Sequence, residues 1–75
     1  MTHTLSIYKL EKGGQRKVAT LSYTQGKLSC SGETVYKDII FSGVDIFNTA
    51  DVIHAMKTYA LEARGTYIAA TYEEK

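Results

Sequence analysis

The residue types that could do chemistry are few in this chain and lie far apart. Cys30 is the only cysteine, and His3 and His54 are the only histidines. A nucleophilic cysteine needs exposure and a basic neighbour, and a zinc site needs several Cys or His ligands at short, fixed spacings. Neither pattern occurs. We therefore interpret Cys30 as a small buried hydrophobe and both histidines as solvated surface residues, and we predict no metal and no cofactor.

Two further groupings resemble catalytic or binding motifs only superficially. Glu33, Asp38 and Asp45 cluster in the sequence, but paired carboxylates do acid–base work only in a cleft that shifts their pKa values. A domain this small rarely encloses such a cleft. The run Gly-Gly-Gln-Arg-Lys at 13–17 lacks the helix N-terminus that a phosphate-binding loop requires. We therefore predict no catalytic residue and no enzymatic activity.

Length and composition indicate one small domain, residues 1–75, with a modest core. A single cysteine is typical of a protein from a reducing cytoplasm. The sequence begins without a basic, apolar leader, and its longest apolar run, residues 39–41, is too short to span a membrane. We expect a cytoplasmic protein without a membrane partner.

The net charge of +1 is unevenly distributed. Residues 1–27 carry five basic side chains against one acidic, and residues 28–75 carry four basic against seven acidic. Such asymmetry is often only solubilising surface charge. A basic first hairpin would also suit an acidic partner or a phosphate backbone.

Glycine turns organise the first part of the chain. Gly13-Gly14 and Gln25-Gly26 separate runs of alternating residues, and glycine readily adopts the positive φ of a two-residue hairpin turn. We predict strands at about 4–12, 16–24 and 27–31. The predicted register pairs Leu10 with Lys17, Tyr8 with Ala19, Tyr23 with Leu28 and Leu21 with Cys30.

This register sorts the side chains of the sheet onto two faces. The core face carries Tyr8, Leu10, Ala19, Leu21, Tyr23, Leu28 and Cys30, and the other carries Thr20, Ser22, Thr24, Ser29 and Ser31. Leu5, Ile7 and Val18 then fall on the hydroxyl face. Either a bulge near Tyr8 turns the first strand over, or both faces are partly covered there.

The second part of the chain contains the clearest helix signal. Asn48 can cap a helix, with Asp51 three residues on, and Phe47 and Val52 have the spacing of a hydrophobic staple. Gly65 suits the end of this helix. Its apolar stripe comprises Val52, Ile53, Met56, Tyr59, Ala60 and Ala63.

Residues 35–42 are rich in β-branched and aromatic types and predict a fourth strand. Residues 66–72 predict a fifth, unless they prolong the helix. The expected fold is α+β: an antiparallel sheet of four or five strands with one amphipathic helix packed on one face, in the order ββββα(β).

Apolar residues on polar faces are the sequence's pointers to a binding surface. Leu5, Ile7 and Val18 cluster on the hydroxyl face, and Leu61 lies between Lys57 and Arg64 on the polar side of the helix. Three adjacent apolar residues indicate a contact, with either the C-terminal strand or a partner. With the basic hairpin, the candidate partner-binding residues are Leu5, Ile7, Val18, Lys9, Arg16, Lys57, Leu61 and Arg64.

We interpret the chain as a non-enzymatic binding module that docks on a protein partner. Its size and lack of motifs suit a compact inhibitor or adaptor of the kind that phages and mobile elements encode. The alternative is a nucleic-acid-binding protein that uses the basic first hairpin. The predicted register disfavours base stacking, since Tyr8 and Tyr23 face the core. A homodimer through an edge strand is compatible with both.

Overall fold

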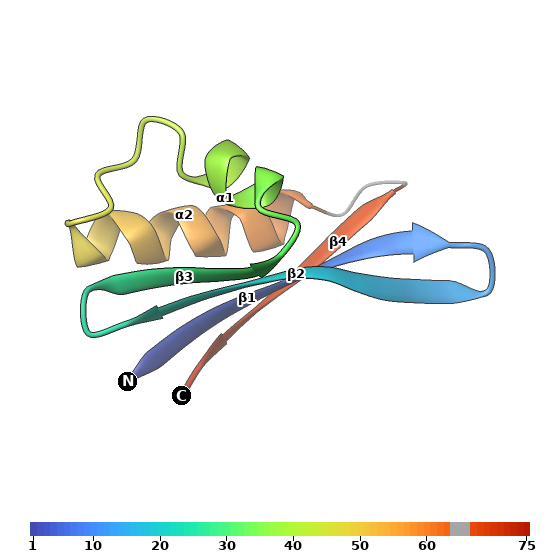
Figure 1. Ribbon diagram of the computed structural model, residues 1–75, viewed down its shortest axis with the longest axis horizontal. Helices are drawn as coiled ribbons and strands as arrows, with labels where there is room; N and C mark the ends of the chain where they lie inside the picture. The colour runs from blue at the N-terminus through green and yellow to red at the C-terminus, as the bar shows by residue number, and fades with distance from the viewer. Residues whose placement is uncertain (64–66) are drawn as a thin grey trace.

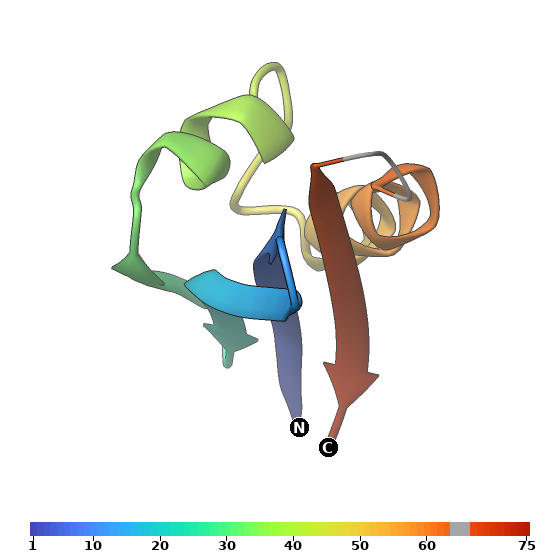
Figure 2. The same cartoon turned by 90° about the vertical axis from the view of Figure 1, so that its right-hand side faces the viewer.

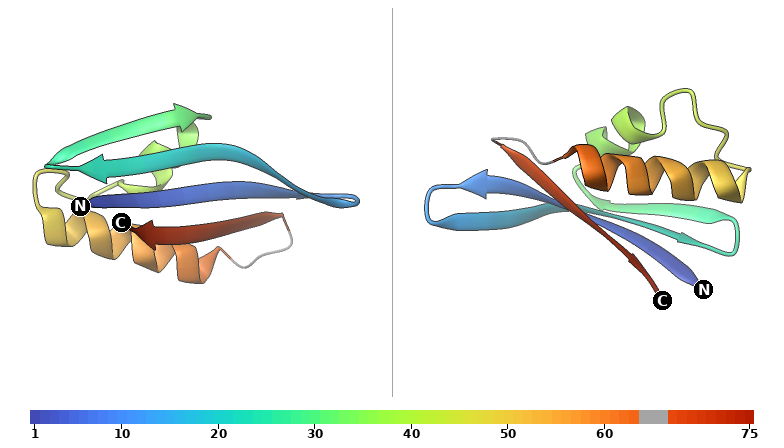
Figure 3. Two further views of the ribbon diagram at one scale, coloured as in Figure 1. Left: turned by 90° about the horizontal axis from the view of Figure 1, so that it is seen from below. Right: turned by 180° about the vertical axis from the view of Figure 1, so that it is seen from behind.

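The computed structural model describes residues 1–63 and 67–75 and shows an antiparallel sheet with helices on one face (Figure 1). In the sheet the strands are ordered β3-β2-β1-β4. Figure 3 shows the opposite face of the sheet, which neither helix covers. The elements in chain order are β1 (Thr2–Glu11), β2 (Gly14–Thr24), β3 (Lys27–Gly32), α1 (Val35–Ile40), α2 (Thr49–Glu62) and β4 (Ile68–Glu74).

The α+β class and the four-stranded antiparallel sheet with a packed helix are confirmed, but the order of elements differs from the prediction. The predicted fourth strand at 35–42 is instead the short helix α1, so the order is βββααβ. The helical form buries Ile40 and Phe41 and leaves Val35 and Ile39 exposed. Tertiary packing of these two residues outweighs the preference of β-branched residues for strands.

The last strand settles the alternative left open for residues 66–72. Residues 68–74 form the strand β4, which pairs with β1 at the edge of the sheet. The helical extension is therefore wrong for the described part of this segment. Gly65, predicted to end the helix, lies outside the described residues.

Helix α2 begins as the sequence predicts. The side chain of Asn48 accepts a hydrogen bond from the backbone N–H of Asp51 at 3.2 Å. Val52 and Met56, from the predicted stripe, are fully buried. The predicted staple is wrong, because Phe47 is 89% exposed whereas Val52 is fully buried.

The register of the second hairpin is confirmed, and that of the first is wrong. Tyr23 pairs with Leu28 and Leu21 with Cys30, as predicted. In the first hairpin the loop is formed by residues 12–13, and Val18 has no partner in β1. The pairing of β1 with β4 is continuous across Ile7 and Tyr8, so the extra residue of this bulge lies in β2.

The bulge reassigns the faces of β1. Ile7 pairs with Ala19 and Leu5 with Leu21, so both apolar side chains of β1 join the core face. Tyr8 pairs with Lys17 instead of Ala19 and lies on the uncovered face with the hydroxyl side chains. The predicted core positions of Tyr8 and Leu10 are therefore wrong.

The core lies between the sheet and α2. Its fully buried large side chains come from β1, β2 and α2: Leu5, Ile7, Leu21, Tyr23, Val52 and Met56. Val18 is also buried. The predicted exposed patch of Leu5, Ile7 and Val18 is thus part of the core cluster, which also contains Val52 and Met56 of α2.

Candidate functional site

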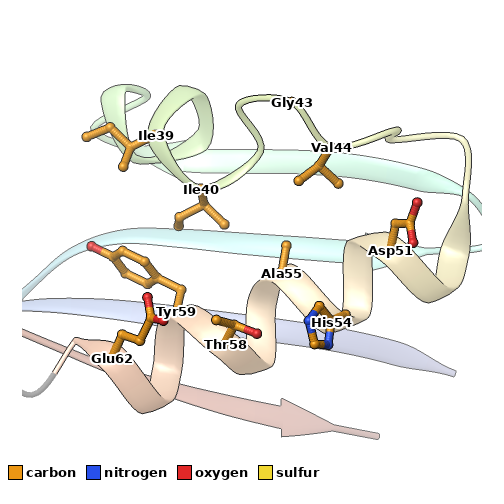
Figure 4. Close-up of a pocket in the computed structure, with 10 residues that line it drawn as sticks. All are labelled: Ile39, Ile40, Gly43, Val44, Asp51, His54, Ala55, Thr58, Tyr59 and Glu62. Atoms are coloured by element: carbon orange, nitrogen blue, oxygen red, sulfur yellow. The ribbon is translucent and has the colours of Figure 1, made fainter.

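A groove of about 500 Å³ separates α2 from α1 and the loop that follows it (Figure 4). Ile40 and Val44 line it from the α1 side, and Ala55 and Tyr59 line it from α2. Figure 2 looks nearly along α2 and shows it next to β4, with α1 on the other side of the picture. The groove therefore has apolar walls and opens to solvent.

Local hydrogen bonds shape the segment that forms the outer wall. The backbone N–H of Val44 donates to the carbonyl of Phe41 at 3.1 Å, and that of Asn48 donates to the carbonyl of Asp45 at 3.0 Å. The side chain of Asp45 also accepts from the N–H of Phe47 at 3.0 Å. These turns fold residues 41–48 back on themselves and leave the ring of Phe47 in solvent.

Exposed apolar side chains concentrate on this same segment. Of the seven large hydrophobic side chains exposed among the described residues, four lie between positions 35 and 47. They are Val35, Ile39, Ile46 and Phe47. Single exposed apolar residues are ordinary, whereas a concentration beside an apolar groove is typical of an interaction surface. We call these four residues, with the groove, the α1–α2 surface.

The charged side chains that line the groove are acidic. Asp51 and Glu62 line it near the two ends of α2, with the imidazole of His54 between them, and its lining among the described residues includes no Lys or Arg. Burial, and to a lesser degree the charge of Tyr36, raises the pKa of Tyr59 above its ordinary value. The Tyr59 hydroxyl is therefore a neutral hydrogen-bonding group at neutral pH.

A second, shallower groove of about 480 Å³ lies between α2 and β4. Its lining residues are Lys57, Ala60, Leu61, Ala70, Thr71 and Tyr72. The ammonium of Lys57 lies 5.5 Å from the centre of the Tyr72 ring. Helix α2 thus has a groove on each side, one facing α1 and one facing the sheet edge.

His3 is buried, which corrects its prediction as a solvated residue. Its Nδ1 lies 2.7 Å from the Tyr72 hydroxyl and 3.6 Å from a carboxylate oxygen of Glu74. Burial, and then the charge of Glu74, raises the pKa of Tyr72. Neither groove described above is lined by His3. We interpret this cluster as a set of structural polar contacts that connect β1 to β4. His54 is exposed, as predicted.

The tip of the β1–β2 hairpin extends beyond the helices (Figure 1). Residues 8–17 carry four basic side chains and one acidic. The Arg16 Nε donates to Glu11 at 2.7 Å, and this hydrogen bond, with the charge of Glu11, raises the pKa of Arg16. The Lys17 ammonium lies 5.8 Å from the centre of the Tyr8 ring, on the uncovered face.

The candidate binding residues from the sequence do not form one surface. Leu5, Ile7 and Val18 are buried, so they cannot form an exposed binding patch in the folded chain. Lys9 and Arg16 lie on the hairpin tip, and Lys57 and Leu61 beside the second groove. Arg64 lies outside the described residues.

Sequence reasoning missed the α1–α2 surface. The sequence analysis places Ile39 in a strand and Phe47 in a hydrophobic staple, which implies burial of the Phe47 ring. The available signal was the apolar spacing around Gly43: Ile39 and Ile40 before it, and Val44, Ile46 and Phe47 after it. That is more apolar surface than a six-residue helix and a short loop can bury.

Comparison with protein-family models, with curated proteins and with solved structures finds no match. No helix within residues 1–63 and 67–75 is long and apolar enough to cross a membrane. Across the same residues, no three His, Cys, Asp or Glu side chains gather in a way that could hold a metal ion.

Proposed function

We propose that this protein is a non-enzymatic, cytoplasmic binding module, an inhibitor or adaptor, that docks on a protein partner through the α1–α2 surface. The observation that carries the proposal is the exposure of Ile39, which lines the apolar groove, and of Phe47, in the loop that follows α1, at 58% and 89%. Burying such side chains against a partner gives about 25 cal/mol per Å², and aromatic side chains are common anchors of protein interfaces.

The groove also indicates what the partner should present. Its walls are apolar and its charged lining residues are Asp51 and Glu62. A segment with apolar side chains in its centre and Lys or Arg at its flanks would fill the groove and neutralise both carboxylates. Complementary charge would guide the register and the rate of association more than the affinity.

Photo-crosslinking tests this proposal at its most exposed residue. A photoreactive phenylalanine analogue in place of Phe47 should be tolerated, because the native ring is in solvent. Irradiation in the native cells should yield a discrete adduct with another protein. The same analogue at Ser29, exposed on the uncovered face of the sheet, is the matched control and should not yield it. Identical adducts from both sites, or none from Phe47, would contradict the proposal.

Nucleic-acid binding by the hairpin tip is a second candidate, and the observed register favours it more than the predicted one. Tyr8 and Lys17 share the uncovered face, on a ribbon that projects beyond the helices (Figure 1). A two-stranded ribbon of this kind can enter a nucleic-acid groove. Tyr23 offers no second stacking ring, because it is buried and its hydroxyl lies 3.1 Å from the Thr49 hydroxyl.

A further inference from the structure

Strand β4 is an edge of the sheet, and its backbone bonds to β1 determine which groups remain free. Thr2 and Lys75 exchange two backbone hydrogen bonds, at 2.6 and 2.8 Å, and the N–H of Leu10 donates to the carbonyl of Tyr67 at 2.7 Å. In an antiparallel pair the hydrogen-bonded residues alternate. The odd-numbered residues of β4 therefore face β1, and the even-numbered residues direct their N–H and C=O groups to the open edge.

The strand β4 itself has little of the protection usual for edge strands, and a basic side chain beside it is Lys57 of α2, over the Tyr72 ring. Its first five residues, 68–72, carry no charge, and the chain has no proline. The other edge strand, β3, is shorter, begins at Lys27 and ends at Gly32. Edge strands commonly avoid self-association through lysine, proline or short length. By these criteria β4 is the edge better suited to pairing.

We propose that two copies of this protein form a symmetric dimer by antiparallel pairing of β4 with β4, centred on Thr71. Only even-numbered residues can exchange hydrogen bonds across the edge. The register that pairs all seven residues of β4 places Thr71 opposite its own copy, Ala70 opposite Tyr72 and Ile68 opposite Glu74. Four residue pairs then exchange up to about eight hydrogen bonds.

The side chains on the helix-covered face fit this register. Ala70 is small where the opposing Tyr72 is large, and the groove between α2 and β4, lined by Ala60, Leu61 and Ala70, gives room beside the edge. Leu61 is 67% exposed at this groove, so the two-fold axis brings both copies of Leu61 toward the centre of the interface. A buried apolar centre with a polar rim is typical of stable interfaces.

Charge also agrees with the pairing. Lys9 is the β1 neighbour of Ile68, and Ile68 would lie opposite Glu74 of the second copy. The basic side chain of one copy and the carboxylate of the other then lie in one cross-strand row on the same face. The dimer places opposite charges at both ends of the interface, which favours antiparallel over parallel pairing.

Engineered cysteines test the register directly. In a Cys30→Ser background, Thr71→Cys should form a disulfide-linked dimer on mild oxidation, because residues at a non-hydrogen-bonded antiparallel pair lie close enough for a disulfide. Ala69→Cys faces Glu73 of the second copy in this register and should cross-link far less. Equal cross-linking of the two variants, or none, would overturn the proposal.

Proline substitution tests the role of the open edge without relying on cross-links. Ala70→Pro removes an outward N–H and leaves the bonds to β1 intact, so the chain should stay folded. It should weaken dimerisation more than about tenfold in sedimentation equilibrium, since one hydrogen bond is lost from each copy. Unchanged dimerisation of folded Ala70→Pro would overturn the proposal, as would a wild-type protein that sediments as a monomer at the concentrations used for NMR spectroscopy.

Discussion

The carbonyl oxygen of Val18 accepts a hydrogen bond from the backbone N–H of Glu33 at 3.0 Å. Val18 is the unpaired residue of the β2 bulge, and Glu33 is the first residue after β3. The bond therefore connects the bulge to the point where the chain leaves the sheet for α1. Gly32 makes this possible, because a Cβ at that position would overlap the Val18 carbonyl.

Gly32→Ala should be strongly destabilising. Gly32 has a φ of +88°, which disfavours any other residue, and it also contacts backbone that cannot move aside. We expect a loss of about 2–4 kcal/mol in the free energy of unfolding, measured by urea denaturation. Gly26→Ala is the matched control. Its φ is +77° with open space around it, so it should lose only about 1–2 kcal/mol. Equal losses would show that the close approach to Val18 does not matter.

Ile7→Glu and Ile39→Glu should have opposite consequences for folding. Ile7 is fully buried in the core, whereas Ile39 is 58% exposed. A carboxylate buried without a partner is heavily penalised, so Ile7→Glu should unfold the domain. Ile39→Glu should change stability by less than about 0.5 kcal/mol. Circular dichroism and thermal melting of both variants check this. A folded Ile7→Glu protein would mean that β1 presents its other face to the core.

High pH should weaken the fold partly through Tyr59. Its pKa is raised above the ordinary value of 10.0, chiefly by burial, so the folded state holds its proton more tightly than the unfolded state. The stabilising contribution is complete below about pH 10 and is lost as the pH rises through the higher folded pKa. Urea midpoints measured across this range should fall less steeply for Tyr59→Phe than for the wild type. Parallel pH profiles would contradict the role assigned to Tyr59.

Binding of nucleic acid should be weak if the α1–α2 surface is the functional one. The hairpin tip carries basic side chains, but the rings near them make a small platform: Tyr8 on the uncovered face, and the exposed Tyr67, whose carbonyl accepts a hydrogen bond from the N–H of Leu10. We expect no single-strand binding tighter than about micromolar at physiological salt. Fluorescence anisotropy at several salt concentrations measures this. Tight binding that falls steeply with salt and is lost in Arg16→Ala with Lys17→Ala would favour the second candidate.

The sequence predicts those elements whose signals are local. The turn at Gln25-Gly26, the strands around it and the Asn48 cap of α2 all depend on neighbouring residues, and each is observed. The bulge at Val18 is not local, because Val18 and Ala19 are adjacent and both are buried. Only the pairing with β1 shows which of these two residues is the unpaired residue of the bulge. A shift of the register by one residue exchanges the two faces of β1.

The candidate site was harder to predict for a related reason. Residues 35–42 have the composition of a strand, and their helical form depends on how Ile40 and Phe41 pack in the finished core. The exposure of Ile39 follows from that packing, and the exposure of Phe47 follows from the Asp45 turn. Surface features of this kind arise only after the tertiary structure is known, so the sequence pointed instead to Leu5 and Ile7.

Affinity capture from native cells tests the docking surface most directly. Nuclease-treated extracts would be passed over the wild type, a variant with Ile39→Glu and Phe47→Glu, and Ser29→Glu. Ser29 is exposed on the uncovered face of the sheet, away from both grooves, which makes its substitution a matched control for added negative charge. We expect one protein to bind the wild type and Ser29→Glu in equal amounts and to be lost from the Ile39 and Phe47 variant. Equal capture by all three proteins would contradict the assignment of the α1–α2 surface as the site of docking.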